Sequence, residues 1–270
     1  MFKADLHCHT TFSDGTMTPL ELLHCAKETG LSGIAITDHD TIDAYTQAIP
    51  AAKELGILLG CGVEFSCMYR KTSVHVLAYD FTLNHLDIAT LCLRHHKRRT
   101  LRNQIILGKL SRLSMPILEE ELVSIGKRSL GRPHIAQLMV KKGYVSSIKE
   151  AFNRYIGDGK SCFDPGVAIS VEETIEIIHQ AGGKAFIAHP HLLQGASRIR
   201  ELLQLPFDGL ECYYARFPKE HEKRWLNIAK EKGWLISGGS DFHGSVKEYI
   251  HLGSSWVDEE SFYKIFQHLL

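Results

Sequence analysis

The stretch "ADLHCHTTFSDG", residues 4 to 15, places two histidines two positions apart in a short segment that runs into a polar loop. This pattern predicts a β-strand that ends at the loop, and alternate residues of a strand share one face. Asp5, His7 and His9 are therefore expected on one face, with Cys8 on the other. Two imidazoles at this spacing can bind one metal ion, and Asp5 behind them can orient an imidazole N–H.

The same unit, a short apolar strand followed by a polar loop and an amphipathic helix, recurs along most of the chain. Strands are predicted at 2–9, 33–37, 56–65, 73–80, 184–190, 207–214 and 234–244. Helices are predicted between them, and Thr18 and Glu21 form a capping-box pattern at the start of the first one. This alternation predicts an α/β fold with a parallel sheet, open or closed into a barrel. Only helices are predicted between 94 and 164, so we expect a helical insertion at 94–164 on a domain made of 1–93 and 165–270.

Residues that commonly bind metals lie at the ends of several other predicted strands. They are His39, Glu64, His75, His189, Asp241 and His243. The carboxyl ends of parallel strands meet at one rim, where α/β proteins build their sites, so we expect these side chains to meet His7 and His9. Asp38 and Asp40 bracket His39 and are expected to support the site or cap a helix rather than to bind metal.

This rim collects too many ligands for one tetrahedral ion. Two or three divalent ions with mixed nitrogen and oxygen ligands fit better, and Zn, Mn and Fe all accept such ligands. Three ions would bring six positive charges against three negative charges from Asp14, Glu64 and Asp241, leaving about three positive charges. Such a pocket attracts phosphate and lowers the pKa of a bridging water, so the chemistry it favours is phosphate ester hydrolysis.

Composition narrows the class of protein. Lysine plus arginine and aspartate plus glutamate both total 31, so the formal net charge is zero. This balance argues against sequence-blind binding of long nucleic acids to a basic surface. No apolar run is long enough to cross a bilayer and the N-terminus has no signal-peptide pattern, so a cytoplasmic protein is expected. Of the 16 histidines, those in predicted helices or loops are assigned to the surface, at positions 24, 85, 95, 96, 179, 251 and 268.

Six motifs in a fixed order carry a family resemblance: "DLHCHTTFSDG", "TDHD", "GVEFS", "VHVLAY", "AHP" and "SGGSDFHG". Together they resemble the PHP (polymerase and histidinol phosphatase) superfamily of metal-dependent phosphoesterases, which implies a distorted (β/α)7 barrel. The segment 131–160, which begins "GRPHIAQLMVKKGYV", resembles the helical insertion of a bacterial subfamily. That subfamily includes 3′,5′-nucleoside bisphosphate phosphatases and 5′→3′ exoribonucleases. The resemblance implies hydrolysis of the 5′-phosphate of such bisphosphates, or of the 5′ ends of short oligonucleotides, with Mn as the first choice of metal.

The resemblance also implies how the ligands are shared among three metals. One metal would take His7, His9, Glu64 and Asp241; a second would share Glu64 and take His75 and His189; a third would take Asp14, His39 and His243. A metal-bridging hydroxide would attack the phosphorus in line. The proton for the leaving oxygen could come from a metal-bound water or from a nearby histidine, and the sequence does not choose between them.

The "GRPH" motif is the candidate for substrate specificity. Arg132 can form a bidentate fork with a phosphate, and His134 could add another donor. In related enzymes this segment faces the active site, so both residues are expected to hold a second phosphate that does not react. The alternative is an exposed arginine and a histidine at a helix N-terminus.

Two further features have competing interpretations. In the basic run 94–102, "RHHKRRTLR", Arg94, Arg98 and Arg102 share one helix face, which would line the access path of an oligonucleotide or simply face solvent. His191, and the group Tyr213, Tyr214 and Arg216, could contact substrate or a base, or could pack at the rim.

Two other functions compete with the nucleotide phosphoesterase. A histidinol-phosphate phosphatase would share the metal residues, but the insertion with "GRPH" speaks against it. A non-catalytic metal-binding module would be expected to have lost some ligands, whereas every expected ligand position here holds a competent side chain.

Overall fold

Two sheets form the body of the protein in the computed structural model, which describes residues 1–270 except 71, 126–128, 194 and 216–217. The first sheet contains three parallel strands, β1 (Ala4–Cys8), β2 (Gly33–Ile36) and β3 (Leu58–Gly60). The second has the order β4-β5-β6-β7-β8, with bounds Gly62–Tyr69, Thr72–Tyr79, Lys184–Ile187, Gly209–Tyr214 and Leu235–Gly239. The predicted α/β class is confirmed.

Part of the second sheet is antiparallel, which corrects the expectation of a parallel sheet. β4 and β5 pair antiparallel along their whole length, and β5 pairs antiparallel with β6. Only two residues separate β4 from β5, whereas a parallel pair needs a crossover of about a dozen residues. The single strand predicted at 56–65 is also divided, because β3 ends at Gly60 and β4 begins in the other sheet at Gly62.

The two sheets touch at both edges without closing into one barrel. Beyond the end of β8, the amide of Asp241 donates to the carbonyl of His7 (2.8 Å), and the amide of His9 donates to the carbonyl of Phe242 (2.9 Å). At the other edge, an isolated parallel bridge joins His39 to Glu64. The closed (β/α)7 barrel is therefore not confirmed in the described residues, but these contacts join the end of β8 to the end of β1 and the segment after β2 to β4.

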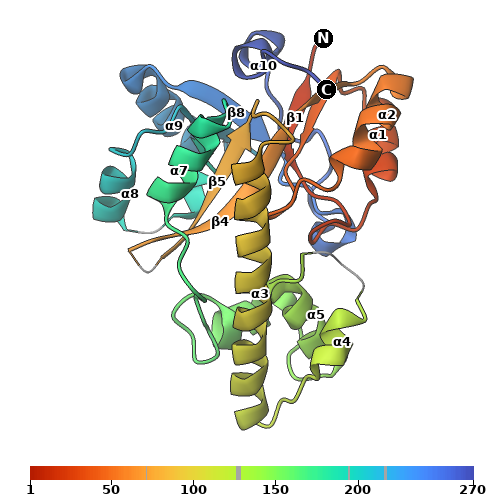
Figure 1. The fold of residues 1–270 in the computed structure, drawn as a ribbon, viewed down its shortest axis with the longest axis vertical. Helices are drawn as coiled ribbons and strands as arrows, with labels where there is room; N and C mark the ends of the chain where they lie inside the picture. Colours follow the sequence, from red (N-terminus) through yellow and green to blue (C-terminus); the bar gives the residue numbers. More distant parts are fainter. Residues whose placement is uncertain (71, 126–128, 194, 216–217) are drawn as a thin grey trace.

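Helices cover the outer faces of both sheets (Figure 1). They are α1 (Pro19–Glu28), α2 (Tyr45–Leu55), α7 (Val171–Gln180), α8 (Ala196–Leu202), α9 (Lys219–Lys232) and α10 (Glu259–Ile265). The predicted capping box of α1 is present, because the Thr18 hydroxyl accepts from the Glu21 amide and the Glu21 carboxylate accepts from the Thr18 amide. No helix in the described part of the chain is long and apolar enough to cross a membrane.

The long helix α3 (Leu86–Arg112) runs from the sheets to a separate group of helices (Figure 1). Ile88 and Leu91, near its start, pack in the core of the second sheet, whereas Ile106 and Leu110 pack in a core of residues 106–162. That second core contains α4 (Glu119–Val123), α5 (Arg132–Lys141), α6 (Ile148–Ala151) and the π-helical turn Phe152–Ile156. The described residues of 94–164 contain no strand, as expected, although the boundary expected at residue 94 falls inside α3.

Candidate active site

The nine residues predicted as metal ligands meet in one largely buried cluster, which we call the nine-residue cluster. They are His7, His9, Asp14, His39, Glu64, His75, His189, Asp241 and His243. Most of them lie at or just beyond the carboxyl ends of β1, β2, β6 and β8. Glu64 and His75 instead lie inside β4 and β5, so the antiparallel hairpin contributes to the site along its length rather than at a strand end.

Glu64 lies at the centre of the cluster and contacts imidazoles with both carboxylate oxygens. Its Oε1 lies 2.7 Å from Nδ1 of His75 and 2.9 Å from Nε2 of His189. Its Oε2 lies 3.1–3.2 Å from nitrogens of three further imidazoles, those of His7, His9 and His39. Burial opposes ionisation of Glu64, but His39, His75 and His7 outweigh it and hold the pKa of this carboxyl well below its usual range.

Two aspartates complete the acidic part of the cluster. Asp241 places Oδ1 3.4 Å from Nε2 of His9 and 3.5 Å from Nδ1 of His243. Asp14 places Oδ1 3.3 Å from Nε2 of His243, and its Oδ2 lies 3.7 Å from Nε2 of His39. The three acidic groups are buried, and each lies between imidazoles of the cluster.

Several polar atoms of the cluster have no hydrogen bond. Nε2 of His9, Nδ1 of His39 and Oδ1 of Asp14 are buried without one. Such atoms usually cost about 1–3 kcal/mol each, and they point inward among groups that ligate metals. Ligand atoms fall within 4.8 Å of one another in three groups: His9, Asp14, His39 and His243; His7, His9 and Asp241; and His39, Glu64 and His75. The residues present therefore fit divalent metal ions with mixed nitrogen and oxygen ligands.

Backbone strain is found in the same place. His189 has φ 28° and Asp241 has φ 56°, and the neighbouring Asp40 has φ 57°. Residues other than glycine rarely adopt such values, which cost on the order of 1–3 kcal/mol each and persist where the surroundings enforce them. Here they turn the chain sharply at strand ends, so that the side chains of His189 and Asp241 reach Glu64 and His9.

Four arginines lie beside the nine-residue cluster, and we call them the arginine cluster: Arg98, Arg99, Arg102 and Arg132. Arg98 and Arg102 are each only 6% exposed, so a solvated helix face is the wrong description of this part of the basic run. Among Arg94, Arg98 and Arg102, only Arg94 lies on a solvated helix face, where its exposed side chain pairs with Glu173. The guanidinium of Arg98 donates to the carbonyls of Ser66 (2.5 Å) and Pro165 (2.9 Å).

The two residues of the "GRPH" motif occupy different surroundings. Arg132 begins α5 and donates to Oδ1 of Asp158 (2.6 Å), while Oδ2 of Asp158 accepts from the amide of Ser73 (3.1 Å), two residues before His75. The carboxylate of Asp158 therefore links Arg132 to the hairpin that carries His75. His134 is buried, and its Nδ1 accepts from the amide of Gly131 (3.0 Å), which caps the start of α5.

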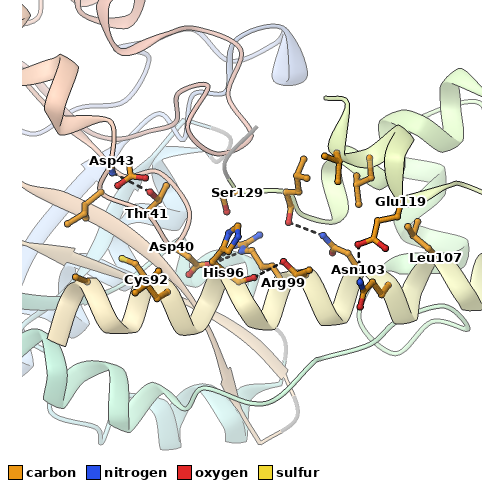
Figure 2. A pocket seen from close by; sticks show the side chains of 18 residues that line it. Asp40, Thr41, Asp43, Cys92, His96, Arg99, Asn103, Leu107, Glu119 and Ser129 are labelled. Atoms are coloured by element: carbon orange, nitrogen blue, oxygen red, sulfur yellow. Dashed lines mark hydrogen bonds and ion pairs between the residues drawn. The ribbon is translucent and has the colours of Figure 1, made fainter. Parts of the chain in front are cut away.

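A cavity of about 710 Å³ opens between α3, α4 and the segment 40–43. Figure 2 shows Asp40 and Arg99 on its floor beside Asn103, with Glu119 and Ser129 across from them. No member of the nine-residue cluster lines it. Its lining includes Asp40, the residue that directly follows His39 in the sequence.

A family model described as "PHP domain" matches residues 5–157, more than half of the chain. The chain belongs to the PHP domain family. This confirms the resemblance that the six motifs indicated.

Known relatives of this PHP chain are similar over most of their length. A 5′-3′ exoribonuclease from Haemophilus influenzae is 36% identical over 246 residues, which cover 89% of this chain and 90% of the relative. A 3′,5′-nucleoside bisphosphate phosphatase from Chromobacterium violaceum is 28% identical over 260 residues, covering 90% and 88%. A crystal structure from Bifidobacterium adolescentis, described as a candidate metal-dependent phosphoesterase, superimposes with a TM-score of 0.87 at 32% identity and covers 97% of this chain and 94% of that one. The PHP protein is accordingly a hydrolase of the metal-dependent phosphoesterase class.

A glutamate that was not predicted from the sequence holds two of the histidines of the PHP site in place. Glu211, in β7, accepts from Nδ1 of His7 with Oε1 (2.8 Å) and from the amide of His189 with Oε2 (2.6 Å). The role expected of Asp5 thus belongs to Glu211. Asp5 instead accepts from the backbone amides of His7, Ser240 and Gly253 and from the Ser240 hydroxyl (2.5 Å). An acidic residue inside the apolar run "GLEC" was the available signal.

Replacing Glu211 with Gln is expected to weaken Mn²⁺ binding about 10–100-fold. The amide keeps the shape of the carboxylate, but it no longer holds Nδ1 of His7 in a charged hydrogen bond. The measurement is a calorimetric titration of metal-free protein with Mn²⁺. Glu231→Gln, on the exposed face of α9, is the control, and affinity equal to that of the control would show that Glu211 does not support metal binding.

Other side chains near the PHP site act on its loops. Asp38 accepts from the hydroxyls of Thr10 and Ser13 (2.5 Å each) and so fixes the loop that carries Asp14, as its expected supporting role requires. The ring of His191 packs 4.9 Å from the ring of Tyr214, and the Tyr214 hydroxyl donates to Asp241 (2.7 Å). Tyr214 therefore faces the metal residues rather than a base, and Arg216 lies outside the described residues.

Proposed function

We propose that this PHP protein hydrolyses a phosphate ester of a nucleotide that carries a second phosphate. The observation that carries the proposal is the position of the arginine cluster: Arg98 and Arg99 both donate to Ser66, which pairs with His75 of the nine-residue cluster in the β4–β5 hairpin. One cluster would bind the reacting phosphate with metal ions, and the other would bind the second phosphate. The expected substrate is a small phosphorylated nucleotide or a short oligonucleotide.

The nine-residue cluster would hold two or three divalent ions, with Mn as the first choice and Zn or Fe as alternatives. When bound, such ions supply a nucleophile at neutral pH by lowering the pKa of a water, and they polarise phosphoryl oxygens. Glu64 can be shared between ions because its two oxygens face different imidazoles. His7, His9 and Asp241 would form one position, His75 and His189 would join Glu64 at another, and Asp14, His39 and His243 would form the third. Glu211 would keep the ring of His7 oriented.

The charges and hydrogen bonds of the arginine cluster support anion binding. Arg99 contacts the carboxylate of Asp40 and Arg132 contacts that of Asp158, whereas the hydrogen bonds of Arg98 and Arg102 go to uncharged oxygens, so the four arginines face two carboxylates. The Nε of Arg102 is buried and has no hydrogen bond. Burial, followed by repulsion from Arg99, Arg132 and Arg98, holds the pKa of Arg102 well below its usual range. A phosphate would relieve both the repulsion and the missing hydrogen bond, and guanidinium groups bind phosphate in a fork geometry.

Room for the organic part of the substrate adjoins this cluster. The cavity of about 710 Å³ includes Arg99 in its lining, together with apolar side chains and amide groups such as that of Asn103. His134 is buried below the start of α5, so in this proposal it supports the backbone that carries Arg132, and a direct phosphate contact for it stays a prediction.

The position of the second phosphate decides which ester is cleaved. A 3′,5′-nucleoside bisphosphate and an RNA with a 5′-phosphate both carry phosphorus at the 5′ and 3′ sides of one ribose. If the arginine cluster holds the 5′-phosphate, the ester on the 3′ side reaches the metal residues, and one site acts on both substrates. Hydrolysis of the 5′-phosphate, the reaction that the family resemblance implies, would release phosphate without shortening an RNA. We therefore propose the first arrangement, and product identity distinguishes the two.

The test is a product analysis with Mn²⁺-loaded protein. Adenosine 3′,5′-bisphosphate is expected to yield adenosine 5′-phosphate, and a 5′-phosphorylated RNA trinucleotide is expected to be cleaved from its 5′ end. Adenosine 3′-phosphate as the product would instead support hydrolysis of the 5′-phosphate. Preference for histidinol phosphate would contradict the nucleotide assignment, and no turnover of any phosphate ester would contradict the proposed function.

Replacing Arg132 with Met is expected to raise the KM for adenosine 3′,5′-bisphosphate about tenfold or more, since charged hydrogen bonds contribute about 1.5–3 kcal/mol. The turnover of adenosine 3′-phosphate, which lacks the 5′-phosphate that the arginine cluster would hold, should change little. Steady-state kinetics on both substrates make the comparison. Arg154→Met, which removes an exposed arginine paired with Glu150, is the control. An unchanged KM for the bisphosphate would contradict the role of Arg132.

A further inference from the structure

Asp241 is held by two donors from outside the nine-residue cluster. The Tyr214 hydroxyl donates to Oδ2 of Asp241 (2.7 Å), and Nζ of Lys247 donates to the same oxygen (2.6 Å). The other oxygen, Oδ1, lies 3.4–3.5 Å from nitrogens of three imidazoles, those of His7, His9 and His243. The two oxygens of one carboxylate thus face different partners.

Both donors are fixed by the fold. Tyr214 ends β7, and it is 2% exposed. Lys247 ends the 3-10 turn Gly244–Lys247, which begins directly after His243, and its side chain is 22% exposed. Burial opposes ionisation of Asp241, but Lys247, followed by His243 and His7, keeps the pKa of this carboxyl well below its usual range. Neither donor belongs to the ligand groups described above.

We propose that Tyr214 and Lys247 are positioning residues that fix Asp241, so that Oδ1 alone is presented to a metal ion. The inference rests on the proposal that Asp241 is a ligand. With Oδ2 bound by a hydroxyl and an ammonium, the carboxylate cannot turn about its Cβ–Cγ bond without losing two short contacts. It remains a one-oxygen ligand whose charge is partly balanced by Lys247, next to the imidazoles of His7 and His9.

The consequence is confined to one part of the site. His7, His9 and Asp241 form one group of ligand atoms, whereas Glu64 with His39 and His75 forms another group that neither donor contacts. Loss of a hydrogen-bond partner behind a ligand typically lowers metal affinity 10–100-fold. Loss of Tyr214 or Lys247 should therefore weaken one class of metal sites and leave the others unchanged.

The experiment titrates metal-free protein with Mn²⁺, following free Mn²⁺ by electron paramagnetic resonance, and needs no substrate. Tyr214→Phe and Lys247→Met are each expected to weaken one class of sites about tenfold or more. Lys247→Arg should retain most of the affinity, because a cation with donors is restored. Lys264→Met is the matched control, since Lys264 makes an equally short contact with Glu260 (2.6 Å) at an exposed pair on α10.

The outcomes separate this inference from the assignment of the ligand itself. Asp241→Asn should lower the number of bound ions; if it binds Mn²⁺ like the wild type, Asp241 is not a ligand. If Asp241→Asn loses metal but both Tyr214→Phe and Lys247→Met bind with wild-type or tighter affinity, the positioning role is overturned. If only one of the two variants loses Mn²⁺ affinity, the proposal that both residues position Asp241 is wrong, and the role belongs to that one residue. Circular dichroism of each metal-free variant verifies folding, and the partly exposed Lys247 can be replaced without opening the core.

Discussion

Replacement of Glu64 by Gln is expected to lower phosphoesterase activity about a thousand-fold or more. Both oxygens of Glu64 lie among imidazoles, and no other carboxylate of the cluster contacts as many. The amide has the same shape but no charge, and it offers one oxygen instead of two. Loss of a shared ligand removes several kcal/mol of stabilisation of the developing charge, and about 4 kcal/mol corresponds to about a thousand-fold in rate.

The measurement pairs kinetics with bound metal per chain after dialysis against Mn²⁺. Glu260→Gln, which removes an exposed carboxylate on α10, should leave both quantities unchanged. If Glu64→Gln kept the metal content and the rate of the wild type, the central place of Glu64 in the proposed function would be wrong. Loss of activity with full metal content would assign Glu64 to substrate rather than to metal.

Replacement of Arg99 by Met is expected to lower the free energy of unfolding by about 3–5 kcal/mol. Nε of Arg99 donates to Oδ2 of Asp40 (2.6 Å), and a terminal nitrogen donates to the Ser66 hydroxyl (2.7 Å). Asp40 is buried, and burial disfavours its charge; Arg99, followed by His95, holds the pKa of Asp40 far below its usual range. Without Arg99 the carboxylate remains buried with its main counter-charge gone.

Urea unfolding in the presence of a chelator measures this effect without a contribution from metal binding. Arg94→Met is the matched control on the same helix, because Arg94 and Glu173 are exposed and such pairs contribute about 0–1 kcal/mol. The double variant Arg99→Met with Asp40→Asn should be less destabilised than Arg99→Met alone, since the orphaned charge is gone. A loss no larger than that of Arg94→Met would contradict the prediction.

The sequence was sufficient to predict which residues meet in the nine-residue cluster. Eight of them interrupt or follow a short apolar strand, where a polar side chain has few alternatives to a shared site, and Asp14 lies in the polar loop after the first strand. The antiparallel hairpin was also within reach of the sequence, because residues 66–72, which separate the strands predicted at 56–65 and 73–80, are too few for a parallel crossover. The pattern of polar residues at the strands predicts the cluster, and the short connection between two strands predicts the hairpin.

The features that were missed depend on packing between distant segments. Glu211 contacts His7 only because β7 lies next to β8, whose end pairs with the end of β1. Arg98 and Arg102 are buried because α5 and the segment 164–166 pack on α3, which periodicity cannot reveal. For the same reason His95, assigned to the surface, is buried beside Asp40, with 3.3 Å between its Nδ1 and Oδ1 of Asp40.

Because α3 is continuous, it fixes the distance between the nine-residue cluster and the arginine cluster. Its first turns are anchored in the sheet core at Ile88 and Leu91, and Arg98 and Arg102 follow on the same unbroken helix. Each residue of a helix advances about 1.5 Å and turns about 100°. The distance between the reacting phosphorus and the retained phosphate would then be set by a rigid helix and not by a flexible loop. Substrates whose two phosphates are separated by one ribose would be preferred. Insertion or deletion of one residue in α3 before Arg98 would rotate Arg98 and Arg102 by about 100° away from the second phosphate.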